Sequence, residues 1–282
     1  MSVNQILDEK YKNLRELLRS YGRLAVAFSG GVDSAFLLKA ATEALPPENV
    51  LAVTARAAIF PRREFREAAE LAAALQLRHL TADLDFVTIP QLAENPPDRC
   101  YHCKKALFQT MIREAGAQGF PLVADGGNLD DADDFRPGAR AVRELGVRSP
   151  LKEARLTKAD IRRLSAELNL PTWNKPACAC LASRFPYGQP ITGEQLKQVE
   201  QAEELLLSHG FRDIRVRCHG PVARIEVGSD ERSSFFDEAF MDTIDAALRA
   251  LGFTFVSLDL RGFRSGGFNH SVDPATLEKY RQ

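Results

Sequence analysis

The sequence predicts an α/β fold in which a parallel sheet has helices on both faces, joined to a smaller α+β domain. Two observations predict it. In residues 1–171, short apolar runs typical of buried parallel strands alternate with longer segments whose apolar residues recur at helical spacing. In residues 172–282, strand-like runs instead alternate apolar and polar residues, as strands buried on one face do. We therefore expect two domains, 1–171 and 172–282.

The first domain is expected to contain four strands, at 24–29, 50–55, 77–84 and 121–127. Its predicted helices lie at 1–22, 33–45, 61–76, 99–115 and 157–168. Pro61 suits the first position of its helix, where no amide hydrogen is needed. Thr157 and Asp160 have the spacing of a helix capping box.

The second domain is expected to follow an αββαβ order. A helix at 193–208, capped by Thr192, precedes two alternating runs. The remaining predicted elements are strands at 213–219 and 223–228, a helix around 231–250 and a strand at 253–260.

Composition excludes several classes of protein. The 282 residues are 45% hydrophobic and 27% charged, with a net charge of -1, so no overall basic field favours nucleic acid. No apolar run approaches the roughly 20 residues of a membrane helix, and the charged N-terminal segment does not resemble a signal peptide. We expect a cytoplasmic protein. Its five cysteines are odd in number and clustered, which favours metal or redox chemistry over disulfides.

The junction between the first predicted strand and its helix reads "SGGVDS" (29–34). Gly30 and Gly31 permit a tight turn and bring backbone amides close to an anion, while the helix N-terminus adds positive potential. Ser29 and Ser34 add hydroxyl donors. The loop lacks the lysine of a Walker motif, and Asp33 is placed to hold Mg²⁺ against a phosphate tail. We expect an ATP-phosphate site here.

This loop resembles the pyrophosphate-binding loop of the N-type ATP pyrophosphatases, which adenylate a carbonyl or carboxyl oxygen. Over nearly the whole chain, further motifs resemble the LarE family of ATP-dependent sulfur transferases, which help to build the nickel-pincer nucleotide cofactor. These motifs are "RCYHCKKALF" (99–108), "DGGNLDDADDFRPG" (125–138), "SPLKEARLTKADIR" (149–162), "KPACACLASRFPYG" (175–188) and "RVRCHGPVARIEV" (215–227).

The resemblance implies a reaction and its residues. ATP adenylates a carboxylate of a pyridinium-3,5-biscarboxylate mononucleotide, and a protein-held sulfur then displaces AMP. Lys104, Ser183 and Arg184 match catalytic or substrate-contacting positions, and Glu203 and Asp230 match regions with acidic residues tied to Mg²⁺ or substrate. Arg56 and Asn128 are also assigned to the cofactor site.

Two sources of sulfur are open. The resemblance implies either that Cys180 is consumed and becomes dehydroalanine, or that a [4Fe–4S] cluster delivers sulfur. Cys178, Cys180 and Cys218 are the right number of thiols to hold such a cluster with one iron open, and we favour this route. It requires the strand to end or turn at Cys218, because alternation places that residue on the apolar face.

The arginines of the two predicted strands form a set. Arg215 and Arg217 share one strand face, and Arg224 shares a face with Glu226 on the next strand. These polar faces can meet across a hairpin. Because arginine binds phosphate and carboxylate bidentately, we expect the three arginines to contact the substrate.

Other interpretations stay open. A tRNA thiolase or an amide-forming synthetase would use the same loop, and a nucleotide-sensing module would need no turnover. Cys100 and Cys103 form either a redox pair or ordinary helix positions. Expected partners are ATP, a small-molecule nucleotide substrate, a sulfur donor and other enzymes of nickel-pincer biosynthesis. We also expect a homo-oligomer, for example a hexamer.

Overall fold

The computed structural model describes residues 3–132, 138–176 and 178–264. These residues form two compact units, each continuous in space but not in sequence. The first contains residues up to Leu84 and from Cys100 to Cys178, and the second contains Asp85–Arg99 and the described residues from Ala179 onward. Each unit is described by itself. The domain boundary at 171 stays a prediction.

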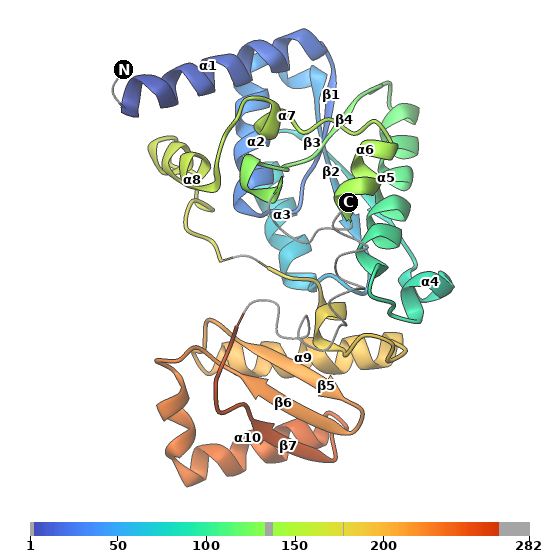
Figure 1. The fold of residues 1–282 in the computed structure, drawn as a ribbon, viewed down its shortest axis with the longest axis vertical. Helices are drawn as coiled ribbons and strands as arrows, with labels where there is room; N and C mark the ends of the chain where they lie inside the picture. The colour runs from blue at the N-terminus through green and yellow to red at the C-terminus, as the bar shows by residue number, and fades with distance from the viewer. Residues whose placement is uncertain (1–2, 133–137, 177, 265–282) are drawn as a thin grey trace. The chain divides into compact units, whose positions relative to one another are not determined.

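A four-stranded sheet forms the centre of the first unit, with strand order β3-β2-β1-β4 and every pair parallel (Figure 1). The strands are β1 (Leu24–Ala27), β2 (Val50–Arg56), β3 (Arg78–Asp83) and β4 (Val123–Ala124). The order reverses at β1, whose neighbours are β2 on one side and β4 on the other. In open parallel sheets, ligands bind beyond the carboxyl ends of strands at such a point, and the SGGVDS loop follows β1 directly.

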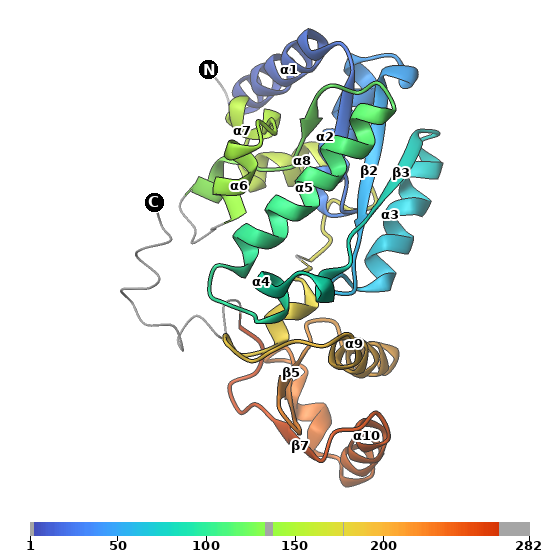
Figure 2. The same cartoon turned by 90° about the vertical axis from the view of Figure 1, so that its right-hand side faces the viewer.

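Helices cover both faces of this sheet, so the predicted fold class is confirmed (Figure 2). Alternate residues of β1 face opposite ways: Leu24 and Val26 pack with one group of helices, and Ala25 packs with the other. The first group is α1 (Val3–Tyr21), α2 (Val32–Ala44), α3 (Arg62–Ala74) and α8 (Lys158–Glu167). The second group is α5 (Arg99–Ala117) and α6 (Gly138–Glu144).

The second unit contains a three-stranded sheet of order β5-β6-β7, in which β5 and β6 are antiparallel and β6 and β7 are parallel. Its main elements are α9 (Gly193–Ser208), β5 (Arg215–His219), β6 (Val222–Glu226), α10 (Glu238–Ala250) and β7 (Phe255–Leu258). This is the predicted αββαβ order. Both helices lie on one side of the sheet (Figure 2), which leaves the polar side chains of β5 and β6 on the other side.

Short helical turns join these elements. They are η1 (Pro47–Asn49), η2 (Phe86–Thr88), α4 (Pro90–Ala93), η3 (Leu129–Ala132), α7 (Pro150–Glu153), η4 (Leu181–Arg184) and η5 (Arg232–Phe236). No helix of the described ranges has the length and apolar character needed to cross a membrane.

The helix ends confirm two predictions and correct two others. Thr157 and Thr192 both form capping boxes, with Asp160 and Gln195 respectively. Pro61 precedes α3 instead of opening it. The helix expected around 231–250 is interrupted, because the Asp237 side chain accepts a hydrogen bond from the Phe240 amide and begins a new helix there.

The segment Asp85–Arg99 packs within the second unit, although it lies between two parts of the first. Asn95 is fully buried there, and its backbone carbonyl accepts a hydrogen bond of 2.8 Å from the Gly188 amide. The Ala93 carbonyl accepts another of 2.8 Å from Ile191. The Arg99 guanidinium lies 4.7 Å from the centre of the Tyr187 ring. Backbone pairing and ring contact therefore anchor this segment.

Candidate active site

The SGGVDS loop of the first unit is arranged by its two serines. The Ser34 hydroxyl accepts a hydrogen bond from the Ser29 amide at 3.2 Å and lies 3.2 Å from the Ser29 hydroxyl. It also donates to the Gly31 carbonyl at 3.2 Å. Gly30 has φ +72°, and a Cβ there would lie 3.1 Å from the Ala68 Cβ. The turn therefore requires glycine for its backbone angle and for its contact with α3.

A second loop, beyond the end of β4, approaches the first. At Gly126 a Cβ would lie 2.9 Å from the Ser34 amide nitrogen and 3.2 Å from the Asp33 Cβ, so only glycine fits without a shift. Asn128 is buried, and its side-chain amide donates to the Asp33 carboxylate at 3.4 Å. The motif 125–138 thus contacts the SGGVDS loop as the sheet order predicts, although its residues 133–137 lie outside the described part of the chain.

Lys158 supplies a cation that the loop itself lacks. It is the first residue of α8, and its ammonium group forms an ion pair with the Asp33 carboxylate. The pair is partly exposed, with 35% of the lysine side chain and 23% of the aspartate side chain accessible. Sequence reasoning missed Lys158 because 125 residues separate the partners. Its place at a capped helix start inside the 149–162 motif was the available signal.

Lys175 was also missed. Its ammonium group lies 2.7 Å from a Glu64 carboxylate oxygen and 2.6 Å from one of Glu67, both on α3, and it donates to the Gly30 carbonyl at 3.3 Å. Burial alone would lower the pKa of Lys175, but the two carboxylates outweigh it and raise that pKa. A charged lysine three residues before Cys178 therefore contacts the backbone of the SGGVDS loop.

Two predicted residues of the first unit have other partners. Arg56, at the end of β2, forms a bidentate pair with Asp83 at 2.6 and 2.8 Å on the surface. Lys104, on α5, packs its aliphatic chain where α6 begins, since a Cβ on Gly138 would lie 2.6 Å from the Lys104 Cδ. The place of Arg56 in the cofactor site and the catalytic role of Lys104 stay predictions.

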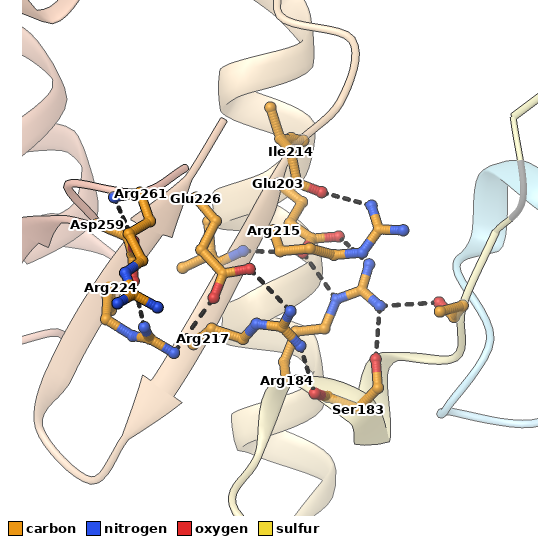
Figure 3. A network of polar contacts seen from close by, with 12 residues as sticks. Ser183, Arg184, Glu203, Ile214, Arg215, Arg217, Arg224, Glu226, Asp259 and Arg261 are labelled. Carbon is orange, nitrogen blue, oxygen red and sulfur yellow. Dashed lines mark hydrogen bonds and ion pairs between the residues drawn. The ribbon is translucent and has the colours of Figure 1, made fainter. Parts of the chain in front are cut away.

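In the second unit, Cys180 immediately precedes the turn η4, and Arg184 ends it. The Arg184 side chain is 2% exposed, and its Nε and Nη2 donate to the two carboxylate oxygens of Glu203 at 2.8 and 2.7 Å. Its Nη1 donates to the carbonyls of Ala179 and Cys180 at 2.9 and 3.1 Å, and to the Ser183 hydroxyl at 2.9 Å. Arg184 therefore holds the cysteine-bearing turn against α9 (Figure 3).

The polar faces of β5 and β6 meet as predicted. Arg217 pairs in register with Arg224, and Arg215 pairs with Glu226. Glu226 lies 2.7 Å from Arg217 and 3.2 Å from Arg224, so one buried carboxylate bridges two guanidinium groups. Arg217 also donates to the Ser183 carbonyl at 2.8 Å (Figure 3).

Arg224, Arg215 and Asp230 have further partners within the second unit. Arg224 is also paired with Asp259 and donates to the His219 ring at 3.2 Å. Arg215 is half-buried, donates to the Ile214 carbonyl at 2.5 Å and lies 4.6 Å from the centre of the Phe263 ring. Asp230, the second predicted Mg²⁺ ligand of this unit, is 73% exposed and lies 3.4 Å from Arg212.

The three cysteines of the predicted cluster have unlike surroundings. Cys178 is exposed, Cys180 is half-buried and Cys218 is fully buried, and none of the three forms a disulfide. β5 continues to His219, the predicted end of this strand, and pairs Cys218 with Ala223, so it does not end or turn at Cys218 as the cluster route requires. Burial raises the pKa of the Cys218 thiol, which disfavours the thiolate that binds iron.

Within residues 3–132, 138–176 and 178–264, no three His, Cys, Asp or Glu side chains group as metal ligands do. The predicted [4Fe–4S] cluster stays a prediction. Asp33 does fit Mg²⁺, which usually takes one or two protein carboxylates together with phosphate oxygens.

Known proteins are similar to this chain in sequence. The family model described as NAD synthase matches residues 6–108, the part that includes the SGGVDS loop. Pyridinium-3,5-bisthiocarboxylic acid mononucleotide synthase of Lactiplantibacillus plantarum is 39% identical over 97% of this chain and 99% of its own length.

Two uncharacterized proteins are also similar. One, of Synechocystis, is 38% identical over 94% of this chain and 98% of its own length. The other, of Methanocaldococcus jannaschii, is 31% identical over 92% of this chain and 94% of its own length. Identity at this level along nearly the full length, together with the glycine loop at the sheet's reversal point, shows that the chain belongs to the LarE family of ATP-using sulfurtransferases.

Proposed function

We propose that this enzyme converts a carboxylate of pyridinium-3,5-biscarboxylic acid mononucleotide into a thiocarboxylate during nickel-pincer nucleotide biosynthesis. The observation that carries the proposal is the near full-length similarity to a synthase named for the bisthiocarboxylic product. The donor-rich loop after β1 supports it, because adenylation requires a grip on the phosphates of ATP.

The first step would be adenylation. A carboxylate oxygen of the substrate attacks the α-phosphorus of ATP, and pyrophosphate leaves. The backbone amides near Gly30 and Gly31, the hydroxyl of Ser29 and the ammonium group of Lys158 are the donors available for the phosphates. Mg²⁺, held by Asp33 and phosphate oxygens, would neutralise their charge. Binding of ATP and Mg²⁺ would then separate Lys158 from Asp33, so that Lys158 contacts a phosphate and Asp33 contacts Mg²⁺.

The second step would transfer sulfur from Cys180. Its thiolate attacks the carbonyl of the acyl-adenylate, and AMP leaves with the electron pair of the broken bond. A base then removes the Cα proton of Cys180, the Cβ–S bond breaks with its electrons going to sulfur, and dehydroalanine remains in the chain. Half-buried Cys180 is accessible for this attack, whereas Cys218 is buried.

The rival source of sulfur is a cluster held by Cys178, Cys180 and Cys218. Its specific support is the spacing of the first two cysteines and the presence of a third free thiol in the chain. We rank it second because it needs Cys218 to leave the apolar face of β5. A homo-oligomer, a cytoplasmic location and a separate sulfur donor stay predictions.

The test is a turnover experiment on anaerobically purified protein with ATP, Mg²⁺ and the biscarboxylate nucleotide. We expect pyrophosphate, AMP and a thiocarboxylate, no more than one transfer per chain, and a protein lighter by hydrogen sulfide. Cys180→Ser should still release pyrophosphate but form no thiocarboxylate, whereas Cys100→Ser should behave as wild type.

Two results would contradict parts of this scheme. Repeated turnover by a brown, iron-containing protein that loses its colour on Cys178→Ala would show that a cluster, and not consumption of Cys180, supplies the sulfur. Failure of the wild type to release pyrophosphate with this substrate would reject the proposed reaction itself.

A further inference from the structure

We propose that Arg184 and Glu203 are positioning residues, which orient the backbone of Cys180 for sulfur transfer instead of binding substrate or metal. This inference rests on the proposed function, since it takes Cys180 as the residue that delivers sulfur. It departs from the expectation that Arg184 is catalytic and that Glu203 binds Mg²⁺.

The contacts of Arg184 point to this role. All three nitrogens of its guanidinium donate to acceptors of the protein, and the group is 2% exposed. Its Nη1 reaches the Cys180 carbonyl at 3.1 Å, to which the Ser183 amide also donates at 3.0 Å. Two donors on one carbonyl fix the peptide plane next to the Cys180 Cα, and thereby the direction in which its side chain leaves the backbone.

Glu203 connects this turn to the rest of the unit. One of its carboxylate oxygens accepts from both Arg184 and the Val216 amide, at 2.8 and 2.9 Å. Glu203 lies on α9 and Val216 on β5, so the carboxylate joins a helix, a strand and the cysteine turn. A metal ion at Glu203 would have to compete with these contacts in a buried site.

A second ion pair holds the other end of the turn. Arg217 is 4% exposed, pairs with Glu226 at 2.7 Å and donates to the Ser183 carbonyl at 2.8 Å. The turn from Cys180 to Arg184 is therefore held by one buried guanidinium near its start and another near its end (Figure 3).

These two ion pairs are expected to contribute more to the geometry of the turn than to the net stability of the fold. A buried ion pair adds little net stability, because desolvation of the charges offsets their attraction, and apolar residues of similar size often replace it without loss. The planar fork of arginine does set orientation, since its donors have fixed directions. Sulfur transfer needs that orientation, because a misplacement of about 1 Å at a reacting group can reduce a rate roughly 100-fold.

A misplaced thiol would have a particular consequence. Adenylation would proceed, since its donors belong to the first unit. The acyl-adenylate would then be hydrolysed by water, which yields AMP without thiocarboxylate. The ratio of thiocarboxylate to AMP therefore reports the position of Cys180, whereas a general loss of folded protein would lower both products equally.

The experiment compares single-turnover product ratios of the full-length chain with ATP, Mg²⁺ and the biscarboxylate nucleotide. The main variant replaces both partners, Arg184→Met with Glu203→Met, so that no unpaired charge is left buried. We expect a wild-type melting temperature within a few degrees, an unchanged KM for ATP, and a ratio at least about tenfold lower. Arg249→Met, which removes an exposed ion pair on α10, is the control and should keep the wild-type ratio.

Arg184→Lys is the second variant, in case the double variant fails to fold. It keeps a positive charge opposite Glu203 but lacks the fork, and we expect it to fold with a lower ratio. A folded variant of either kind with the wild-type ratio would overturn the inference. That outcome is distinct from failure of the proposed function, in which the wild type itself releases no pyrophosphate.

Discussion

The SGGVDS loop and the cysteine turn 180–184 differ in how each is held. Around the loop, glycine contacts and serine hydroxyls set the backbone, and its one aspartate has a partly exposed lysine partner. Around the turn, two buried arginines are each paired with a buried glutamate. The loop leaves its charges free to exchange partners when phosphate arrives, whereas the charges at the turn are already committed to the protein.

This difference suggests a division of labour. A phosphate site benefits from donors that can leave one partner for another at little expense, as an exposed ion pair allows. A turn that presents a thiol benefits from contacts that are difficult to break. Substitutions of charged residues at the loop should therefore affect phosphate binding more than stability, whereas substitutions in the ion pairs at the turn should affect stability.

The largest expected effect is on the loop. Gly126→Ala would place a methyl group 2.9 Å from the Ser34 amide nitrogen, which faces the proposed phosphate site. Because that atom is backbone, the loops must separate, and we expect pyrophosphate release to fall at least about 100-fold. Initial rates of pyrophosphate release measure it.

Gly116→Ala is the matched control. A Cβ at this position in α5 has no neighbour within 4 Å, and alanine favours helix, so activity should be kept. Equal loss of activity in both variants would show that the close contact at Gly126 has no special role.

The second prediction compares two carboxylates by stability. Glu203→Gln should leave a buried guanidinium without its counter-charge and lower the free energy of unfolding by about 3–5 kcal/mol. Asp33→Asn should lower it by less than about 1 kcal/mol, because its ion pair is partly exposed, although it should abolish most pyrophosphate release. Denaturant titration gives both values, and equal destabilisation would remove the distinction between the two regions.

Sequence patterns predicted some of this arrangement and not the rest. Strand alternation, which is a local rule, predicted that the polar faces of β5 and β6 meet, but it did not predict that Glu226 pairs with Arg217. Lys158 was missed because its partner Asp33 is far away in the chain, so only the folded sheet brings them together.

The end of β5 was predicted at His219, because Gly220 and Pro221 signal a turn, and the hairpin does turn there, at Gly220 with φ +59°. The roles of individual site residues in binding ATP and substrate stay predictions.

The smallest expected effect concerns pH. Burial, with the charges of Arg224 and Arg217, lowers the pKa of His219, while Glu226 opposes this. The unfolded chain therefore binds this proton more readily, so stability is complete above about pH 6.5 and declines as the pH falls below it. His219→Gln keeps an acceptor for Arg224 without titrating.

We expect this variant to reduce the loss of stability between pH 7 and pH 5 by well under about 1 kcal/mol, since solvent screens a half-buried ring. Thermal unfolding across that range measures it. His79→Gln, in the first unit, is the comparison, because burial lowers the pKa of His79 as well. An unchanged pH profile for His219→Gln would assign the decline to other groups.

The membership of Asp85–Arg99 in the second unit has a consequence for synthesis of the chain. These residues leave the ribosome well before Tyr187, Gly188 and Ile191, which pack against them or pair with their backbone. Asn95 and Leu92, which are buried in the folded chain, therefore stay exposed to solvent until most of the protein has been synthesised. A chain truncated at residue 171 would therefore lack the residues that cover Asn95 and Leu92 in the full-length protein.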